Sequence, residues 1–345
     1  MSHLGQMNQK PAAPTIHDVA RRSGVSISTV SRVINANVPV SDAAAARVQA
    51  AMQELKYVPR AAARSLALRQ NGAVGLLVSE LLGDFFGPLL TGIEEVVTEQ
   101  GYDLLISTSG RRGAPRELPG SLGSHNTDGL LIFAGALSDA GVVHAHSLGL
   151  PMVLVHRPSP PGLGLPCVTI ENKAASRAIV EHLIAAHGRR RIVLLRGLAD
   201  NDDSHWREMG YQEALSQHQL PLDPALALAG DFDREVAGRS IRQLVAAAVP
   251  FDAVFAGDDE AAVGVLQALQ SAGKRVPEDV AVVGFDDQRL AAVTHPPLTT
   301  VHAPTAKVGR AAAQQLLALV RTGRAEPLTL LPTELIIRRS CGCEP

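Results

Sequence analysis

The sequence predicts a small helical domain at the N-terminus, followed by a larger α/β domain with two lobes. The helical domain is predicted from two short helical patterns within residues 15–35, which are separated by a turn at Gly24. The α/β domain is predicted from short apolar runs that alternate with helical patterns after Gly72, as is typical of parallel sheets. Because the alternation starts a second time near Asn172, we expect two lobes with a cleft between them.

Residues 15–35 carry start and stop signals for two helices. Thr15 is a candidate N-cap with Asp18 three residues later, which is the spacing of a capping box. Gly24 can end the first helix in the left-handed conformation, and Ser26 is a natural N-cap for the second. The apolar spacing predicts that these positions are buried: Ile16, Val19, Ala20, Val30, Val33 and Ile34.

The second helix is left with a small, hydroxyl-rich face and one guanidinium group, which suits a helix in the major groove of DNA. This face consists of Ile27, Ser28, Thr29, Ser31, Arg32 and Asn35. A third helix is predicted to open at Ser41-Asp42 and to stop before Pro59, because proline disfavours the helical conformation in the preceding residue. The basic stretch 60–72 follows, with a clear apolar point at Leu66.

Five short motifs in this region resemble the lactose-repressor (LacI/GalR) family. They are Thr15-x-x-Asp18-Val-Ala, Gly24-Val-Ser, Thr29-Val-Ser-Arg-Val, Tyr57-x-Pro59 and Ala63-Arg-Ser-Leu66. The resemblance implies a helix-turn-helix that reads half an operator, followed by a hinge that folds on DNA. It also implies base contacts for Ile27, Ser28 and Arg32, and positions nearer phosphate for Thr29, Ser31, Asn35 and Tyr57. Leu66 would be a minor-groove wedge with Ala63 beside it.

The rest of the chain resembles the family's effector domain, which is similar to periplasmic sugar-binding proteins. The matching phrases are His187-Gly-Arg-Arg, Pro277-Glu-Asp-Val, Val283-Gly-Phe-Asp-Asp287 and Pro297-Leu-Thr-Thr-Val301. We therefore expect a disordered leader (1–14), a helix-turn-helix domain (15–60), a hinge (61–72) and an effector-binding and dimerisation domain (73–345). The resemblance implies lobe one at about 73–171 and 304–331, and lobe two at about 172–303 and 332–340.

Residues at the ends of predicted strands are candidates for an effector site. Asp286 can accept hydroxyl hydrogen bonds, and Arg207 offers a planar fork for a diol or carboxylate. Phe86 and Phe232 match family positions that place a ring against the ligand; the looser matches are Phe133, His156 and Asp258. Core packing of the rings and a structural Arg207–Asp286 ion pair are the alternatives. The acidic segment 200–203 favours a neutral sugar or polyol over a purine, a phosphosugar or an acid.

Charge and composition limit the remaining possibilities. Residues 1–72 contain nine Lys/Arg against three Asp/Glu, whereas the whole chain has 32 against 34, so a basic head precedes an acidic body. Neither a signal-peptide core nor a membrane-length apolar run is present in the sequence, which indicates a cytoplasmic, nucleoid-associated protein. Cys341 and Cys343 could form a metal or redox pair, but two residues do not make a site, so an inert surface tail is the favoured interpretation. The pairs His144/His146 and His182/His187 lack a third ligand at metal spacing, so neither metal nor cofactor is expected.

The sequence thus predicts a DNA-binding transcriptional repressor, a homodimer whose operator affinity is controlled by a small sugar. The alternative is a sugar-binding protein, exported or cytoplasmic, without a regulatory role. An enzyme is disfavoured, because the nearest dinucleotide-like motif, at 162–167, lacks its last glycine and opens no helix. At 111–127 the family usually has a charged helix that contributes to the dimer contact, but glycines and prolines predict a loop here.

Overall fold

The computed structural model describes residues 14–35, 39–57, 71–81, 83–109 and 117–344. The chain forms two compact units, Met1–Asn71 and Gly72–Pro345. The first is helical and the second contains two parallel sheets, so the expected fold class is confirmed. The predicted leader, except for residue 14, and most of the predicted hinge, including Ala63 and Leu66, lie outside the described residues.

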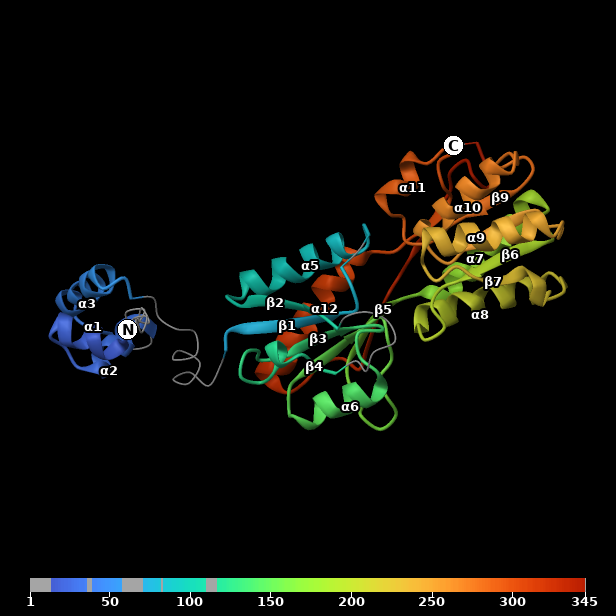
Figure 1. Cartoon of the computed structure of the whole chain (residues 1–345). Coiled ribbons are helices and arrows are strands. Elements are labelled where there is room, and N and C mark those ends of the chain that lie inside the picture. The colour runs from blue at the N-terminus through green and yellow to red at the C-terminus, as the bar shows by residue number, and fades with distance from the viewer. Residues whose placement is uncertain (1–13, 36–38, 58–70, 82, 110–116, 345) are drawn as a thin grey trace, which may run out of the picture. The chain divides into compact units, whose positions relative to one another are not determined.

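The N-terminal unit has three described helices, α1 (Ile16–Ser23), α2 (Ile27–Asn35) and α3 (Asp42–Glu54) (Figure 1). The capping box is confirmed: the Asp18 carboxylate accepts from the Thr15 N–H at 2.9 Å, and the Thr15 hydroxyl accepts from the Asp18 N–H at 3.4 Å. Gly24 ends α1 with φ of 69°, as a left-handed cap requires. The three helices share a small apolar core of Val19, Ala20, Val30, Val48, Ala51 and Tyr57.

Lobe one contains a six-stranded parallel sheet in the order β11-β5-β4-β3-β1-β2. Its strands are β1 (Ala73–Val78), β2 (Asp103–Thr108), β3 (Leu130–Phe133), β4 (Met152–Val155), β5 (Cys167–Ile170) and β11 (Leu328–Leu331). Val74 and Leu76 share a core with α5 (Phe86–Glu99) and α12 (Thr305–Thr322). Leu77, which points the other way, shares a core with α6 (Asp139–Ser147). Burial on both faces explains why the inner strands β1, β3 and β4 are continuous apolar runs, whereas the edge strands β2 and β11 are partly exposed.

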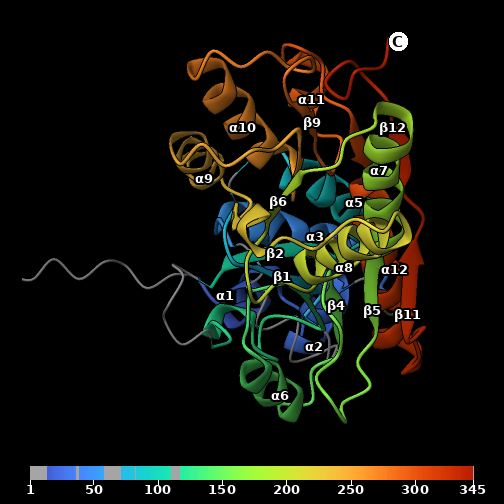
Figure 2. The same cartoon turned by 90° about the vertical axis from the view of Figure 1, so that its right-hand side faces the viewer.

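Lobe two is built on a parallel sheet in the order β7-β6-β8-β9. Its strands are β6 (Ile192–Arg196), β7 (Ala227–Ala229), β8 (Ala253–Ala256) and β9 (Ala281–Val283), and its long helices are α7 (Asn172–His187), α8 (Asp202–Gln217), α9 (Arg234–Ala246) and α10 (Asp259–Ser271). Ile192 and Leu194 share a core with α7 and α8, whereas Val193 and Leu195 share one with α9 and α10. Figure 2 shows these helix pairs on opposite sides of β6.

The chain passes between the lobes three times. It does so from β5 into α7, from β10 (Thr300–His302) into α12, and from β11 into β12 (Glu334–Ile336). Two crossings are tied together, because the Glu171 N–H donates to the Leu331 carbonyl at 2.9 Å and the Thr333 hydroxyl donates to the Glu171 carbonyl at 3.0 Å. β10 and β12 pair antiparallel beside the lobe-two sheet.

The remaining short elements are α11 (Arg289–Val293), η1 (Gly120–Leu122) and η2 (Pro224–Leu226). Within 117–127, the described part of the segment predicted to be a loop, η1 is a single 3-10 turn and there is no α-helix. Glycine and proline therefore prevent a helix there, as expected.

Close packing of α5 against α12 gives the first testable prediction. A Cβ at Gly92 would meet the Ala306 carbonyl, and a Cβ at Gly309 would meet the Leu89 carbonyl, so the two helix backbones touch. We predict that Gly92→Ala lowers the free energy of unfolding by about 1–3 kcal/mol through overpacking, measured by urea denaturation. Gly87→Ala on the same helix is the control, because its Cβ would meet nothing within 4 Å. Equal stability of the two variants would contradict this packing.

Candidate functional site

The exposed face of α2 is one candidate site. Ile27 is 42% exposed, and Ser28 and Arg32 are also exposed, whereas Thr29 and Ser31 are half-buried. Ser26 holds the start of the helix, because its hydroxyl accepts from the Thr29 N–H at 3.1 Å. Its oxygen also lies 2.7 Å from the Ser28 hydroxyl, which fixes the first turn. The result is a small polar surface with a guanidinium at its centre.

Four other residues are predicted to contact DNA, and the described structure places none of their side chains on this face. The ring of Tyr57 is 9% exposed and packs in the core of the three helices. Its expected position near phosphate stays a prediction. Asn35 ends α2, but its side chain lies outside the described set. Ala63 and Leu66 also lie outside the described residues.

The second candidate site is the cleft of the Gly72–Pro345 unit. Six of the seven predicted effector residues lie at or after the carboxyl ends of parallel strands, where ligands of such folds bind. These six are Phe86, Phe133, His156, Phe232, Asp258 and Asp286. The seventh, Arg207, lies on α8 and points back to the same strand ends.

Arg207 is the centre of a buried polar network. Its Nε donates to Asn172 Oδ1 at 2.9 Å, its Nη2 to Asp286 Oδ1 at 3.1 Å, and its Nη1 to the Gly257 carbonyl. The guanidinium lies 3.7 Å from the centroid of the Phe285 ring, in cation–π contact, with Phe232 at 5.7 Å. Arg207 is only 4% exposed, so this cation is paired and hydrogen-bonded as burial demands.

A second polar contact joins the lobes. His156 Nδ1, at the end of β4, lies 2.8 Å from Asp203 Oδ2 on α8, and Asn172 Nδ2 donates to Asp203 Oδ1 at 2.8 Å. Burial alone would raise the pKa of Asp203, but His156, Arg207 and the Asn172 hydrogen bond outweigh it and lower that pKa. Asp203 belongs to the acidic segment noted in the sequence, and Asn201 caps the helix on which it lies.

Aromatic rings line the lobe-one side of the cleft. Phe85, Phe86 and Phe133 meet one another edge to face with centroids 5.3–5.8 Å apart, and His156 packs against Phe85 and Phe133. Two non-glycine residues at strand ends of the cleft have a positive φ, which strains the backbone: His156 after β4, with φ of 58°, and Asp286 after β9, with φ of 102°. Strained positions of non-glycine residues are typical of ligand sites.

Sequence reasoning missed several members of this arrangement: Phe85, Asn172, Asp203 as an individual residue, and Phe285. Asn172 had a usable signal, since it begins a helix directly after the strand that crosses between lobes. Asp203 lies within the acidic segment 200–203, but no local sequence signal shows which aspartate of that segment points into the cleft.

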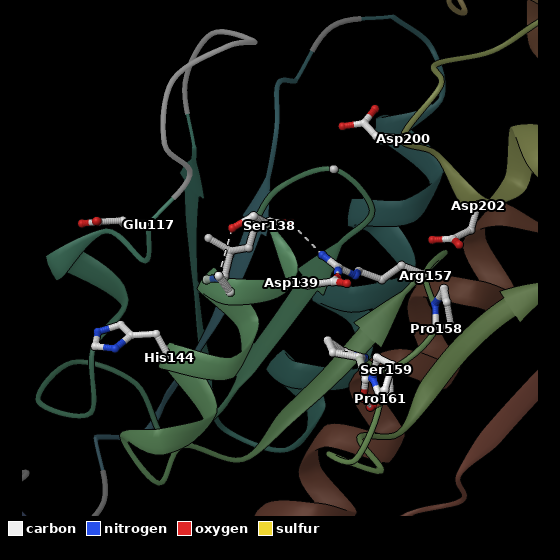
Figure 3. Close-up of a pocket in the computed structure, with 15 residues that line it drawn as sticks. Glu117, Ser138, Asp139, His144, Arg157, Pro158, Ser159, Pro161, Asp200 and Asp202 are labelled. Atoms are coloured by element: carbon white, nitrogen blue, oxygen red, sulfur yellow. Dashed lines mark hydrogen bonds and ion pairs between the residues drawn. The ribbon is translucent and has the colours of Figure 1, made fainter.

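Open hollows adjoin this polar core. One of about 1220 Å³ is bordered by Ser138, Asp139, Arg157 and Asp200 (Figure 3), and none of the seven predicted effector residues lines it. Arg157 donates there to the Leu137 carbonyl at 2.7 Å and pairs with Asp139. A hollow of about 560 Å³ includes His156 and Asp203, and another of about 660 Å³ includes Asp286. Of the seven predicted residues, His156 therefore borders the hollow of about 560 Å³ and Asp286 the hollow of about 660 Å³.

Comparisons with known proteins match both units. Residues 15–60 match the model of bacterial regulatory proteins of the lacI family, and residues 180–341 match a periplasmic binding protein-like domain. The transcriptional regulator CelR of Thermobifida fusca is 36% identical over 95% of this chain and 98% of its own length. The ribose operon repressor of Escherichia coli K12 is 33% identical, with 94% and 98% covered.

The chain belongs to the LacI family of bacterial regulatory proteins. A solved lac repressor dimer bound to operator and an anti-inducer is 27% identical with a TM-score of 0.83, covering 96% of this chain and 99% of that one. A solved CelR–cellobiose complex is 34% identical with a TM-score of 0.72, covering 95% and 99%. This family consists of DNA-binding regulators rather than enzymes. Among the helices of the described residues, none is long and apolar enough to cross a bilayer.

The buried carboxyl of Asp258 gives a pH prediction. Burial, with a further contribution from the Asp286 carboxylate, raises its pKa to about 7. Between about pH 4 and pH 7 the folded chain retains a proton that the unfolded chain loses, so this group lowers stability as pH rises. Asp258→Asn removes the titration and retains an acceptor for the Ala261 N–H. The stability gained by the variant should therefore grow with pH over this window.

The measurement is urea denaturation of wild type and Asp258→Asn at about pH 5 and pH 8, where each unit of pKa difference is worth about 1.4 kcal/mol. Asp233→Asn, at the exposed cap of α9, is the control for the effect of an amide at an N-cap. A gain of the same size at both pH values would show that Asp258 has no raised pKa.

Proposed function

We propose that this protein is a homodimeric transcriptional repressor that acts in the cytoplasm, with operator affinity controlled by a neutral sugar or polyol. The observation that carries the ligand class is the Arg207 network. Each guanidinium nitrogen of Arg207 donates one hydrogen bond, to Asn172, Gly257 or Asp286, which supports recognition of the ligand by the surrounding acceptors rather than by a free cation. The relatives with a named sugar are CelR, solved with cellobiose, and the ribose operon repressor.

The charge balance of the cleft supports a neutral ligand. Asp203, Asp258 and Asp286 all lie buried around Arg207 and His156. Asp203, whose pKa is lowered, can accept hydrogen bonds from hydroxyl groups and would repel an anionic ligand, whereas Asp258, with a pKa of about 7, also has a protonated form that can donate to a hydroxyl. The half-buried rings of Phe133 and Phe232 could pack against the C–H surface of a sugar, whereas Phe86 is buried in the core of lobe one. A purine or a phosphosugar would lack the additional cationic contacts it needs among these residues.

The α2 face supports operator reading. Arg32 can form a bidentate hydrogen bond with guanine, and exposed Ile27 and Ser28 can contact base edges. A homodimer would present two such helices to a palindromic site. A sugar-binding protein without a regulatory role, the alternative, would have no use for this surface.

Arg32→Ala tests the DNA half of the proposal. We expect its affinity for an operator, recovered by selection from random duplexes with wild-type protein, to fall about 5–150-fold, since a bidentate base contact is worth about 1–3 kcal/mol. Affinity for unrelated duplex should fall much less, which an electrophoretic mobility shift assay at fixed salt would measure. Arg47→Ala on α3 removes an equal charge away from α2 and serves as the control. An unchanged ratio of specific to non-specific affinity in Arg32→Ala would reject this role.

Arg207→Gln tests the effector half. Arg207 positions the Asn172 and Asp286 side chains, and the loss of one hydrogen bond to a charged group costs about 1.5–3 kcal/mol, so affinity for a responsive sugar should fall about tenfold or more. Cellobiose and ribose are the first probes, by calorimetry and by release of operator DNA. Arg196→Gln is the matched control, because Arg196 pairs with Glu208 at the surface of the same lobe. Operator binding by both variants without sugar separates a lost site from a misfolded chain, and normal sugar response in Arg207→Gln would refute the assignment.

A further inference from the structure

Four side chains with metal-ligating atoms meet at the far end of α7. His182 and His187 lie in its last two turns, and Cys341 and Cys343 follow β12 near the C-terminus. Their ligand atoms all lie within 4.8 Å of one another. Sequence reasoning set both pairs aside because neither had a third ligand nearby. The fold supplies those ligands from more than 150 residues away.

The measured distances fit a tetrahedral ion. The two Nε2 atoms of His182 and His187 are 3.3 Å apart, and Cys343 Sγ lies 3.5 Å from the first and 3.3 Å from the second. Around a tetrahedral Zn²⁺, with bonds of about 2.0–2.1 Å to nitrogen and 2.3 Å to sulfur, ligand atoms are separated by about 3.3–3.8 Å. Three ligand atoms already have this spacing, and Cys341 is close enough to be the fourth.

The backbone holds this arrangement in place. Gly342 has φ of 112°, and a Cβ there would lie 3.1 Å from His187 Nδ1, so glycine suits the close approach. Ser340 is buried just before, where its hydroxyl donates to the Val282 carbonyl at 2.6 Å and accepts from the Thr299 N–H at 2.8 Å. The Ser340 N–H also donates to the Pro297 carbonyl at 3.0 Å. These hydrogen bonds fix the start of the C-terminal tail, the segment from Ser340 onward, and so hold Cys341 and Cys343 next to α7.

We propose that His182, His187, Cys341 and Cys343 form a structural Zn²⁺ site that fastens the C-terminal tail to α7. Two thiolates and two imidazoles in tetrahedral array are a donor set that selects zinc over hard cations such as Mg²⁺ or Ca²⁺. Four protein ligands leave no open coordination position, which is the mark of a structural rather than a catalytic zinc. The site is independent of the sugar and operator assignments.

Titration of the metal-free full-length chain with Zn²⁺ and with Co²⁺ tests the site. We expect one ion per chain, with thiolate-to-cobalt charge-transfer bands and the strong visible absorption of tetrahedral Co²⁺. Zn²⁺ should raise the thermal midpoint, because the ion binds only the folded site. Cys343→Ser and His182→Gln, at half-buried positions, should each weaken binding by at least about tenfold, since even residues that merely orient a ligand contribute about 10–100-fold.

Two controls match these variants in chemistry. Cys167→Ser changes a cysteine in lobe one that donates to the Arg157 carbonyl, and His144→Gln changes a histidine on α6. Both should bind the metal as wild type does. Absence of stoichiometric binding, a cobalt spectrum without thiolate bands, or undiminished affinity in Cys343→Ser would overturn the proposal. A Cys341–Cys343 disulfide in protein purified under reducing conditions would also overturn it.

Discussion

The buried guanidinium of Arg207 is the constraint around which the cleft is organised. A cation at 4% exposure is tolerated only when its donors find partners, and these come from three separate places: Asn172 after a crossing strand, Gly257 after β8, and Asp286 after β9. Satisfying it therefore fixes the strand ends of lobe two against the first crossing of the chain. Two of these partners also border hollows, Asn172 the one of about 560 Å³ and Asp286 the one of about 660 Å³.

This arrangement explains how a small ligand can influence distant parts of the chain. Asn172 contacts both Arg207 and Asp203, and Asp203 reaches His156 in the other lobe. Under the proposed function, a sugar that competed for these hydrogen bonds would change the relative free energies of the lobe arrangements, through contacts that differ between those arrangements. A coupling of about 1–3 kcal/mol is enough to shift operator affinity by about 5–150-fold, with an equal reciprocal effect of DNA on sugar affinity.

Short-range sequence patterns correctly predicted helix caps and buried strands, because these features depend on residues a few positions apart. The Thr15–Asp18 capping box, the Gly24 cap and the strands buried on both faces follow from short spacings, and the strand ends then located Asp258 and Asp286. Contacts between distant segments escaped prediction. The packing of Tyr57 in the three-helix core was not predicted, and Asp203 could not be distinguished from its acidic neighbours. His182 and Cys343 are 161 residues apart, so no spacing rule could pair them.

Helix α7 connects the two chemical clusters of the larger unit. Its first residue, Asn172, donates to Asp203 and accepts from Arg207, and its last two turns carry His182 and His187. Gly210 on α8 lets that helix approach so closely that a Cβ there would meet the Lys173 carbonyl, which leaves α7 little freedom to slide at its start. Zinc would fasten the other end to the tail that follows β12, the last strand to cross between lobes. A helix held at both ends moves as a rigid body. A change of hydrogen-bond partner at Asn172 would therefore displace α7 as a whole, and the displacement would reach the strands that cross between the lobes instead of being confined to lobe two.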